Sequence, residues 1–270
     1  MKSNEKILAY YNQGFESARL TGESLERLRT ESILQRLLPK PPATILDVGG
    51  ADGVYAFPLA RAGYNVHLVD PIPLHIQQAQ QKAESSGIQV ASITEGDARK
   101  LAFADCSADA VLFLGPLYHL CARTDRLAAL HEAHRTLKPG GVFLGAFISR
   151  YASLLDGLRQ DWLERDEFAA IVRQDLQNGE HRNPTTNPFY FTDTQFHHPD
   201  EARAELEQAG FGNVQLLAVE GPAWLVSGIE NQLARPRGAQ RILEFLQQIE
   251  GENSLNGVSG HFIGAAQRAR

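Results

Sequence analysis

Residues 44–53 read TILDVGGADG, an apolar run that reaches Asp47 and Val48 and then continues into glycines at positions 49, 50 and 53. A glycine-rich turn directly after a buried strand lets the backbone approach a ligand closely, because no side chain stands in the way. In open α/β sheets, ligands bind beyond the carboxyl ends of the strands. The stretch therefore predicts a first strand followed by a backbone cradle for a ligand.

Apolar strand patterns and amphipathic helix patterns alternate after this turn. The expected strands cover residues 43–48, 64–70, 89–97 (a strand with its loop), 107–116 and 142–148. The expected helices cover residues 54–63, 73–87 and 125–137. The fourth strand pattern is almost wholly apolar, which is typical of a parallel strand covered on both faces. This alternation predicts a doubly wound α/β sheet.

The flanking segments have a different character. Two helices are expected over residues 5–20 and 23–38, and the prolines of PKPP at 39–42 end the second. Residues 150–180 have a charged helical pattern, and residues 181–199 are polar and aromatic with three prolines. A long irregular stretch of this kind is usually a functional loop or lid. A helix over 199–210, a strand over 214–221, a helix within 234–251 and a strand over 260–268 are expected to complete the chain.

These patterns predict one domain over residues 1–270. We expect an N-terminal helical cap over 1–40, a ligand-binding core over 43–148, a lid or substrate insert over 150–198, and the remaining part of the sheet over 199–270.

The composition excludes several classes of function. The net charge is −6, with 26 Lys and Arg against 32 Asp and Glu, which argues against a general nucleic-acid binder or a protein held on an anionic membrane surface. Cys106 and Cys121 belong to no CxxC or Cys/His cluster, so neither a structural metal site nor a disulfide framework is expected. No secretory signal and no run of 18 apolar residues is visible, which favours a cytoplasmic protein without a membrane partner.

An acidic residue narrows the class of ligand. Asp70 ends the strand at 64–70 and follows Asp47 by 23 residues, close to the spacing of about 20 at which a carboxylate binds a ribose. A dinucleotide site needs GxGxxG, whereas the run here is Gly49-Gly50-Ala51-Asp52-Gly53. Asp52 would also lie near the phosphates of a dinucleotide. A nucleoside ligand without phosphate is therefore favoured, and a nicotinamide-dependent dehydrogenase is disfavoured.

Four stretches in order resemble the motifs of the class I S-adenosylmethionine (SAM)-dependent methyltransferases of small-molecule type. They are ILDVGGADG, HLVDP, EGDARKLAFADCSADAVLFLGPLYHL and LKPGGVFLGAF, and they fall within residues 43–148. Ala51 stands where the family usually has glycine. The resemblance implies a Rossmann-like seven-stranded sheet whose last strand is antiparallel, with residues 260–268 beside the fifth strand, and it implies SAM as the cofactor.

The resemblance also implies a set of cofactor-binding residues: Asp47, Gly49, Gly50, Ala51, Gly53, Asp70, Pro71, Asp97, Ala98 and Gly115. Asp70 would bind the ribose, and Asp97 and Ala98 would face the adenine. N-terminal helices close over the cofactor in many relatives, so Tyr11, Arg19 and Arg29 are further candidates, although an ordinary amphipathic helix with solvated arginines fits the same pattern.

Methyl transfer needs alignment of the acceptor with the methyl group and, where the acceptor carries a proton, a general base. Tyr118 and His119, in GPLYH, are the candidate catalytic residues and also candidate substrate contacts. The alternatives are packing for Tyr118 and a hydrogen bond to a backbone carbonyl for His119. Secondary candidates for the base are His197, His198 and Glu220.

Aromatic residues of the later segments are the remaining site candidates. Five aromatic residues are expected to line a substrate pocket or lid, or else to form a satellite hydrophobic cluster: Phe189, Tyr190, Phe191, Phe196 and Trp224. NPFY at 187–190 resembles a motif of amino-methylating nucleic-acid enzymes, but it lies far from the fourth strand and is interpreted as a turn. His134, in HEAH, shares a helical stripe with leucines, so we expect it to pack instead of binding a metal.

The expected function is SAM-dependent methyl transfer to a small molecule by in-line displacement. One alternative is a catalytically silent module that binds SAM or S-adenosylhomocysteine as a regulator or partner subunit, and another is a protein or RNA methyltransferase. The sequence leaves open the acceptor, the methylated atom (O, N, S or C) and the choice between monomer and homodimer.

Overall fold

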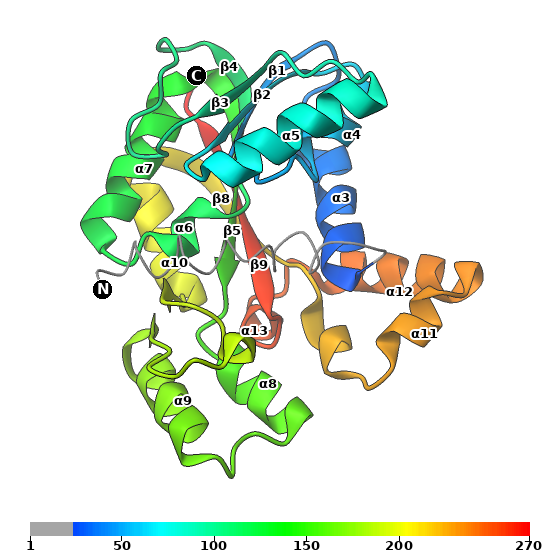
Figure 1. Ribbon diagram of the computed structural model, residues 1–270, viewed down its shortest axis with the longest axis vertical. Coiled ribbons are helices and arrows are strands. Elements are labelled where there is room, and N and C mark those ends of the chain that lie inside the picture. The colour runs from blue at the N-terminus through cyan, green and yellow to red at the C-terminus, as the bar shows by residue number, and fades with distance from the viewer. Residues whose placement is uncertain (1–23) are drawn as a thin grey trace.

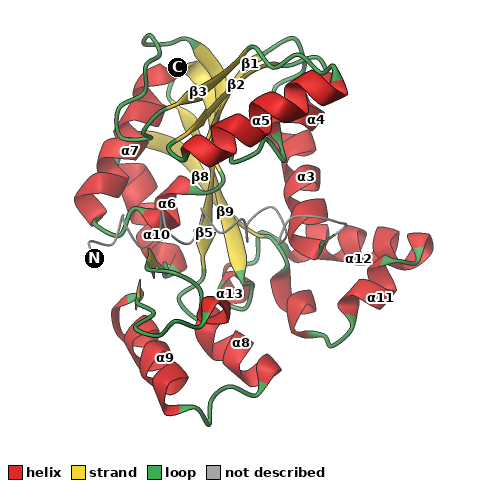
Figure 2. Ribbon diagram, viewed as in Figure 1, coloured by secondary structure: helices red, strands yellow, loops and turns green. Residues whose placement is uncertain are grey.

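The computed structural model describes residues 24–270, and its centre is a seven-stranded mixed sheet (Figures 1 and 2). The strand order is β3-β2-β1-β4-β5-β9-β8. The strands are β1 (Thr44–Val48), β2 (Asn65–Asp70), β3 (Ser92–Glu95), β4 (Ala108–Phe113), β5 (Leu137–Ile148), β8 (Phe211–Ala218) and β9 (His261–Arg268). β1 to β5 pair in parallel, and β9 is antiparallel to both β5 and β8. The predicted sheet, with its antiparallel last strand beside the fifth, is confirmed.

Helices cover both faces of the sheet (Figure 1). One face packs on α3 (Leu25–Leu37), α4 (Ala56–Arg61) and α5 (Pro73–Ser86), and the other packs on α7 (Arg123–Thr136) and α10 (Pro199–Gln208). β4 lies between β1 and β5, and its residues from Ala110 to Phe113 are fully buried, as an apolar strand between two helical layers should be. His134 packs its ring against Phe211 at 5.2 Å, so its predicted packing role is confirmed.

The segment after β5 lies at the end of the sheet where the parallel strands finish. It contains α8 (Ala152–Gln160), α9 (Asp166–Asn178), the short pair β6 (Glu180–His181) and β7 (Thr194–Gln195), and the 3₁₀ helix η1 (Pro188–Tyr190). η1 contains most of NPFY, which confirms the predicted turn. Its own small core, around Phe168, Ile171 and Tyr190, is separate from the two cores of the sheet.

A second group of helices follows β8. It consists of the 3₁₀ helix η2 (Gly221–Leu225), α11 (Ile229–Leu233), α12 (Pro236–Ile249) and α13 (Asn253–Asn256). Leu25 of α3 packs with Ile229, Leu233 and Leu246 of this group. Within residues 24–270, no helix is both long and apolar enough to cross a membrane.

Several expected element boundaries were wrong. β8 covers Phe211–Ala218 instead of residues 214–221. The fourth strand stops at Phe113 instead of residue 116, because Pro116 begins the one-turn helix α6 (Pro116–His119), a position in which proline has a favourable φ. β5 starts at Leu137 instead of residue 142, and its register with β4 shifts over Lys138–Gly141. The expected helix at 5–20, with Tyr11 and Arg19, lies outside the described residues.

Candidate active site

The glycine turn after β1 forms a backbone cradle between the ends of β1, β2 and β4. Gly49 and Gly53 have φ of +71° and +85°, a region that favours glycine. The N–H of Gly49 donates to the carbonyl of Val69 at 2.7 Å. A Cβ added to Gly49 would lie 2.8 Å from Cδ of Pro116, so only glycine allows the turn to approach the loop after β4 this closely.

Asp47 is a fully buried carboxylate beneath this turn. Among residues 24–270, neither of its oxygens has a hydrogen-bond partner, and a Cβ on Gly50 would lie 2.8 Å from its Oδ2. Burial, followed by the negative charge of Asp70, raises the pKa of Asp47 to about 7. An unsatisfied buried carboxylate is costly, and it fits a ligand that brings positive charge or hydrogen-bond donors. SAM carries both an ammonium and a sulfonium, so the residues present fit this group.

Asp70 holds the turn to the start of α5. Its Oδ2 accepts from the N–H of Ala51 at 2.9 Å, and its Oδ1 accepts from the N–H of Ile72 at 2.9 Å and contacts Nδ1 of His75 at 3.0 Å. The bond to Ala51 fixes a residue whose φ is +48°, which is uncommon outside glycine. An ionised carboxylate has about four acceptor positions, so these contacts are compatible with the ribose contact, which stays a prediction.

The remaining cofactor candidates have varied surroundings. Asp97 forms a bidentate ion pair with Arg99, with Oδ2 2.6 Å from Nη2, and the Arg99 hydrogen bond holds the pKa of Asp97 below its usual range. Ala98 is buried. Arg29 is also buried, where it donates to the carbonyl of Val219 at 3.0 Å and pairs with Glu250. Val219 follows the edge strand β8, which β4, β5 and β9 separate from β1.

A cavity of about 640 Å³ lies between α6, the end of β5, the segment after β5, η2 and the start of β9. The aromatic residues expected around a substrate come together in its wall: Tyr118, Tyr190, Phe191, Phe196 and Trp224. Phe189, a further member of the expected set, also lines it, as does Phe168, which was not expected there. His119 is not among the described lining residues, and its ring packs on those of Tyr118 and Phe191 at 4.6 and 6.1 Å.

Tyr118 joins the cradle to this cavity. Its hydroxyl donates to the carbonyl of Leu114 at 3.2 Å and lies 3.8 Å from the position of a Cβ on Gly115. The same Cβ would lie 3.3 Å from the carbonyl oxygen of Gly49. A molecule in the cradle and a molecule in the cavity would therefore be neighbours across Gly115.

Two histidines of the cavity wall are paired with carboxylates, and the sequence did not predict these pairs. Nδ1 of His181 lies 2.9 Å from the carboxylate of Asp175, and its Nε2 lies 2.8 Å from the carbonyl of Tyr190. Elsewhere in the wall, Nδ1 of His261 lies 2.7 Å from the carboxylate of Glu220. No spacing in the sequence signals either pair, because each depends on how distant segments fold together.

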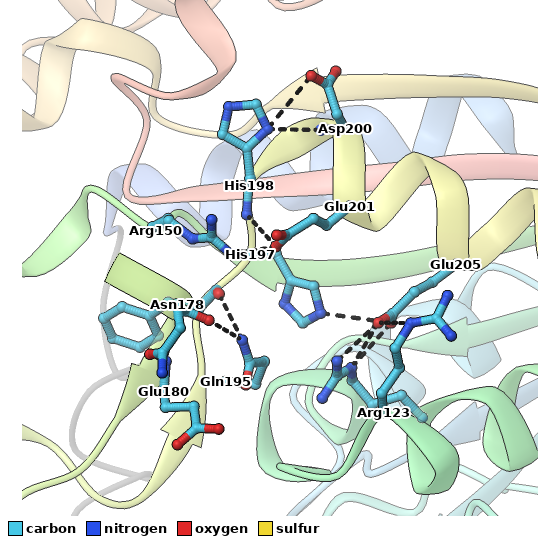
Figure 3. Close-up of polar contacts among 12 residues, drawn as sticks. Arg123, Arg150, Asn178, Glu180, Gln195, His197, His198, Asp200, Glu201 and Glu205 are labelled. Carbon is cyan, nitrogen blue, oxygen red and sulfur yellow. Dashed lines mark hydrogen bonds and ion pairs between the residues drawn. The ribbon is translucent and has the colours of Figure 1, made fainter. Parts of the chain in front are cut away.

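Neither of the other two secondary candidates for the base, His197 and His198, is among the described lining residues of the cavity. Figure 3 shows the polar contacts of these two histidines. His197 is 1% exposed and packs against Phe147, and burial lowers its pKa. Its Nε2 lies 3.6 Å from Glu205, which is too long for a hydrogen bond. His198 caps α10, where its Nδ1 accepts from the N–H of Asp200 at 3.2 Å.

Comparisons with known proteins show a similarity to methyltransferases. A family model described as a methyltransferase domain matches residues 45–141. The ubiquinone biosynthesis O-methyltransferase of Paramagnetospirillum magneticum is 35% identical over 165 residues, which cover 54% of this chain and 62% of that protein. A ubiquinone/menaquinone biosynthesis C-methyltransferase of Zymomonas mobilis is 33% identical over 119 residues, or 44% of this chain and 48% of that protein. The chain thus spans about half to three fifths of the length of these curated relatives.

Solved structures share the fold over most of the chain. A SAM-dependent methyltransferase of Methanosarcina mazei has a TM-score of 0.59 at 17% identity and covers 88% of this chain and 97% of its own. A possible histamine N-methyltransferase of Thermotoga maritima has a TM-score of 0.57 at 18% identity, with 98% and 99% coverage. The [4+2]-cyclase SpnF has a TM-score of 0.56 at 17% identity, with 90% and 80% coverage. Since a cyclase shares the fold, the reaction has to be argued from the site.

Proposed function

Because this chain belongs to the class I SAM-dependent methyltransferases, we propose that it transfers a methyl group from SAM to a small molecule that carries a planar ring. The observation that supports this most directly is the contact between the glycine cradle and the aromatic cavity at Gly115 and Tyr118. A donor held in the cradle would present its methyl group to an acceptor held in the cavity.

The cavity supports a small acceptor over a macromolecule. Its volume of about 640 Å³ falls in the range of small-molecule sites, roughly 300–1,000 Å³. Aromatic walls bind planar rings through offset and edge-to-face contacts. The net charge of −6 gives no support to an RNA acceptor. The relatives' names refer to O- and C-methylation in quinone biosynthesis, which supports a hydroxylated ring as the acceptor.

The chemical demands on the protein are modest. When bound, SAM supplies an activated methyl group on a sulfonium whose leaving group is a neutral thioether. The chain's own residues would orient the acceptor and exclude water from the space between cradle and cavity. Asp47 and Asp70 would hold the charged and sugar parts of the cofactor, and the ring of Tyr118 would form the wall that both molecules contact.

The proposal is tested in two steps. Isothermal titration calorimetry should show binding of SAM and of S-adenosylhomocysteine. Protein incubated with methyl-labelled SAM should then transfer label to hydroxylated benzoates or quinols, or to a component of a small-molecule extract, and excess S-adenosylhomocysteine should suppress that transfer. Binding without transfer to any fraction would favour the silent module, and label in protein or RNA would show that the acceptor class is wrong.

A further inference from the structure

His261 lies in the wall of the cavity, at the start of β9. His261 is the first residue of β9 and pairs with Ile148, the last residue of β5. Because β9 runs antiparallel to β5, its first residue lies at the end of the sheet where the parallel strands finish. Both His261 and Ile148 line the aromatic cavity, and the His261 side chain is partly exposed.

Glu220 fixes the orientation of this histidine. The carboxylate is 5% exposed; its Oε1 lies 2.7 Å from Nδ1 of His261, and its Oε2 accepts from the backbone N–H of the same residue at 2.9 Å. The hydroxyl of Ser259 also donates to Oε2 at 2.9 Å. The Ser259 oxygen in turn accepts from the N–H groups of Glu220 and Gly221 at 3.1 and 3.0 Å. The carboxylate is therefore anchored by both of its oxygens.

This geometry selects a tautomer. The Glu220 carboxylate accepts from the Ser259 hydroxyl and from the His261 N–H, and a carboxylate is an acceptor, so Nδ1 of His261 carries the proton and donates it to Glu220. The lone pair of the neutral imidazole then lies on Nε2. A histidine held by a carboxylate through one ring nitrogen, with the other nitrogen as proton acceptor, is the arrangement of a general base.

We propose that His261 is the general base of the methyl transfer, with Glu220 as its positioning residue, and that the acceptor atom is the oxygen of a ring hydroxyl. This inference rests on the proposed function. The acceptor oxygen forms its bond to the methyl carbon as the carbon–sulfur bond breaks with its electron pair on sulfur, and the hydroxyl proton passes to Nε2 of His261. The products are a methyl ether, a neutral thioether and an imidazolium.

A second carboxylate lies close to the His261 ring. Glu26 of α3 also lines the cavity, and one atom each from Glu26, Glu220 and His261 lies within 4.8 Å of the others. Two negative charges beside the ring stabilise the imidazolium that the step creates. A base is needed only where the acceptor carries a proton to lose, and the aromatic wall supports an acceptor whose hydroxyl is attached to a ring.

Three variants test this assignment: His261→Gln, Glu220→Gln and, as a matched control, His131→Gln, which alters an exposed histidine of α7. With a ring-hydroxyl acceptor, His261→Gln should lower kcat by roughly 10²- to 10⁴-fold, the usual contribution of a general base, with unchanged affinity for SAM. Glu220→Gln should lower kcat less, and His131→Gln should match the native protein. Circular dichroism and thermal unfolding establish that each variant is folded.

Three further measurements separate a base from a structural role. The loss in His261→Gln should shrink for nitrophenol acceptors that are already ionised at the assay pH, and added imidazole should restore activity to His261→Gly. In the absence of SAM and at a pH below the pKa of free 4-nitrocatechol, this ligand bound to the native protein should show the absorption of its anion, and His261→Gln should bind it in the neutral form. The absorption experiment needs no turnover, so it also decides the assignment if methyl transfer itself is not found.

The outcomes are distinct. Native protein that transfers methyl groups to no acceptor contradicts the proposed function. Native protein that is active beside an equally active His261→Gln contradicts the base assignment alone. Loss of activity on treatment with EDTA and its return with a divalent metal would show that Glu26, Glu220 and His261 hold a metal ion, and that result would also overturn the base.

Discussion

Replacing Asp47 by asparagine should stabilise the protein at pH 8 and do so much less at pH 5. The carboxylate is fully buried, neither oxygen has a hydrogen-bond partner in the described part of the chain, and burial with the charge of Asp70 raises its pKa from 3.8 to about 7. Between pH 3.8 and about pH 7 the folded protein therefore retains a proton that the unfolded chain has released. The free energy of unfolding that depends on this group is highest below pH 3.8, where both states are protonated. It falls as the pH rises, and the loss is complete once the pH has passed through 7.

The magnitude follows from the gap between the two pKa values. A gap of about three units corresponds to roughly 4 kcal/mol at 1.36 kcal/mol per unit, and the penalty is fully developed above pH 7. At pH 5 the penalty is only partly developed, because this pH lies above the unfolded pKa of 3.8 but well below the folded pKa of about 7. Asparagine has the same shape and cannot ionise, so its effect on the free energy of unfolding should become more favourable by about 2–3 kcal/mol between pH 5 and pH 8.

Urea unfolding followed by the fluorescence of Trp162 and Trp224 measures this difference. Asp109→Asn is the matched control. Burial alone would raise the pKa of Asp109, but hydrogen bonds from Lys138 and from the N–H of Thr44 hold it below its usual range. Asp109 is thus ionised at both pH values, and its substitution should cost the same at each. If the effect of Asp47→Asn on the free energy of unfolding does not change with pH, the ionised Asp47 side chain does not destabilise the folded protein and the reasoning is refuted.

Three other substitutions test separate parts of the site and fold. Asp70→Ala should weaken SAM binding by roughly 1–3 kcal/mol, the range for a lost charged hydrogen bond, and unchanged affinity by calorimetry would remove the ribose contact. His119→Ala should lower turnover without changing SAM affinity, because its ring supports that of Tyr118; full activity in the transfer assay would exclude it from catalysis. Glu205→Gln should destabilise the fold by roughly 3–5 kcal/mol in urea unfolding, since it leaves the buried Arg126 without its counter-charge, and a loss below about 1 kcal/mol would contradict this.

The sheet could be predicted because its signals are local. A strand such as TILDV and the glycines that follow it act within ten residues, and burial on both faces makes β4 almost wholly apolar. Boundaries were less certain, because one residue decides them: Pro116 ends the strand pattern early and begins α6. The antiparallel place of β9 came from the family resemblance, since no local pattern distinguishes a parallel strand from an antiparallel one.

The glycine turn after β1 could also be predicted, because its signal is local. The polar pairs at the cavity wall could not, because each joins segments that are distant in the sequence. Glu220 was expected as one candidate for the base, but His261, 41 residues later, was not. Only the pairing of β9 with β5 and β8 brings the two together. The contact of Asp175 with His181 likewise depends on how α9 turns back through Gly179 into β6. The sequence can indicate each of these side chains as a candidate. Which of them form pairs depends on the tertiary fold.

When ionised, Asp47 lowers the stability of the ligand-free fold, and this loss of stability indicates that the residue serves ligand binding. If packing were its only role, asparagine or an apolar residue would serve better above pH 7, because neither would bring a charge into a site without donors. A cation in the cradle would reverse this preference by compensating the ionised carboxylate. Asp47→Asn should therefore gain stability and lose SAM affinity at the same pH, the trade-off expected where a strained group serves binding. A variant that gained stability at pH 8 and bound SAM as tightly as the native protein would separate the buried charge from the cofactor.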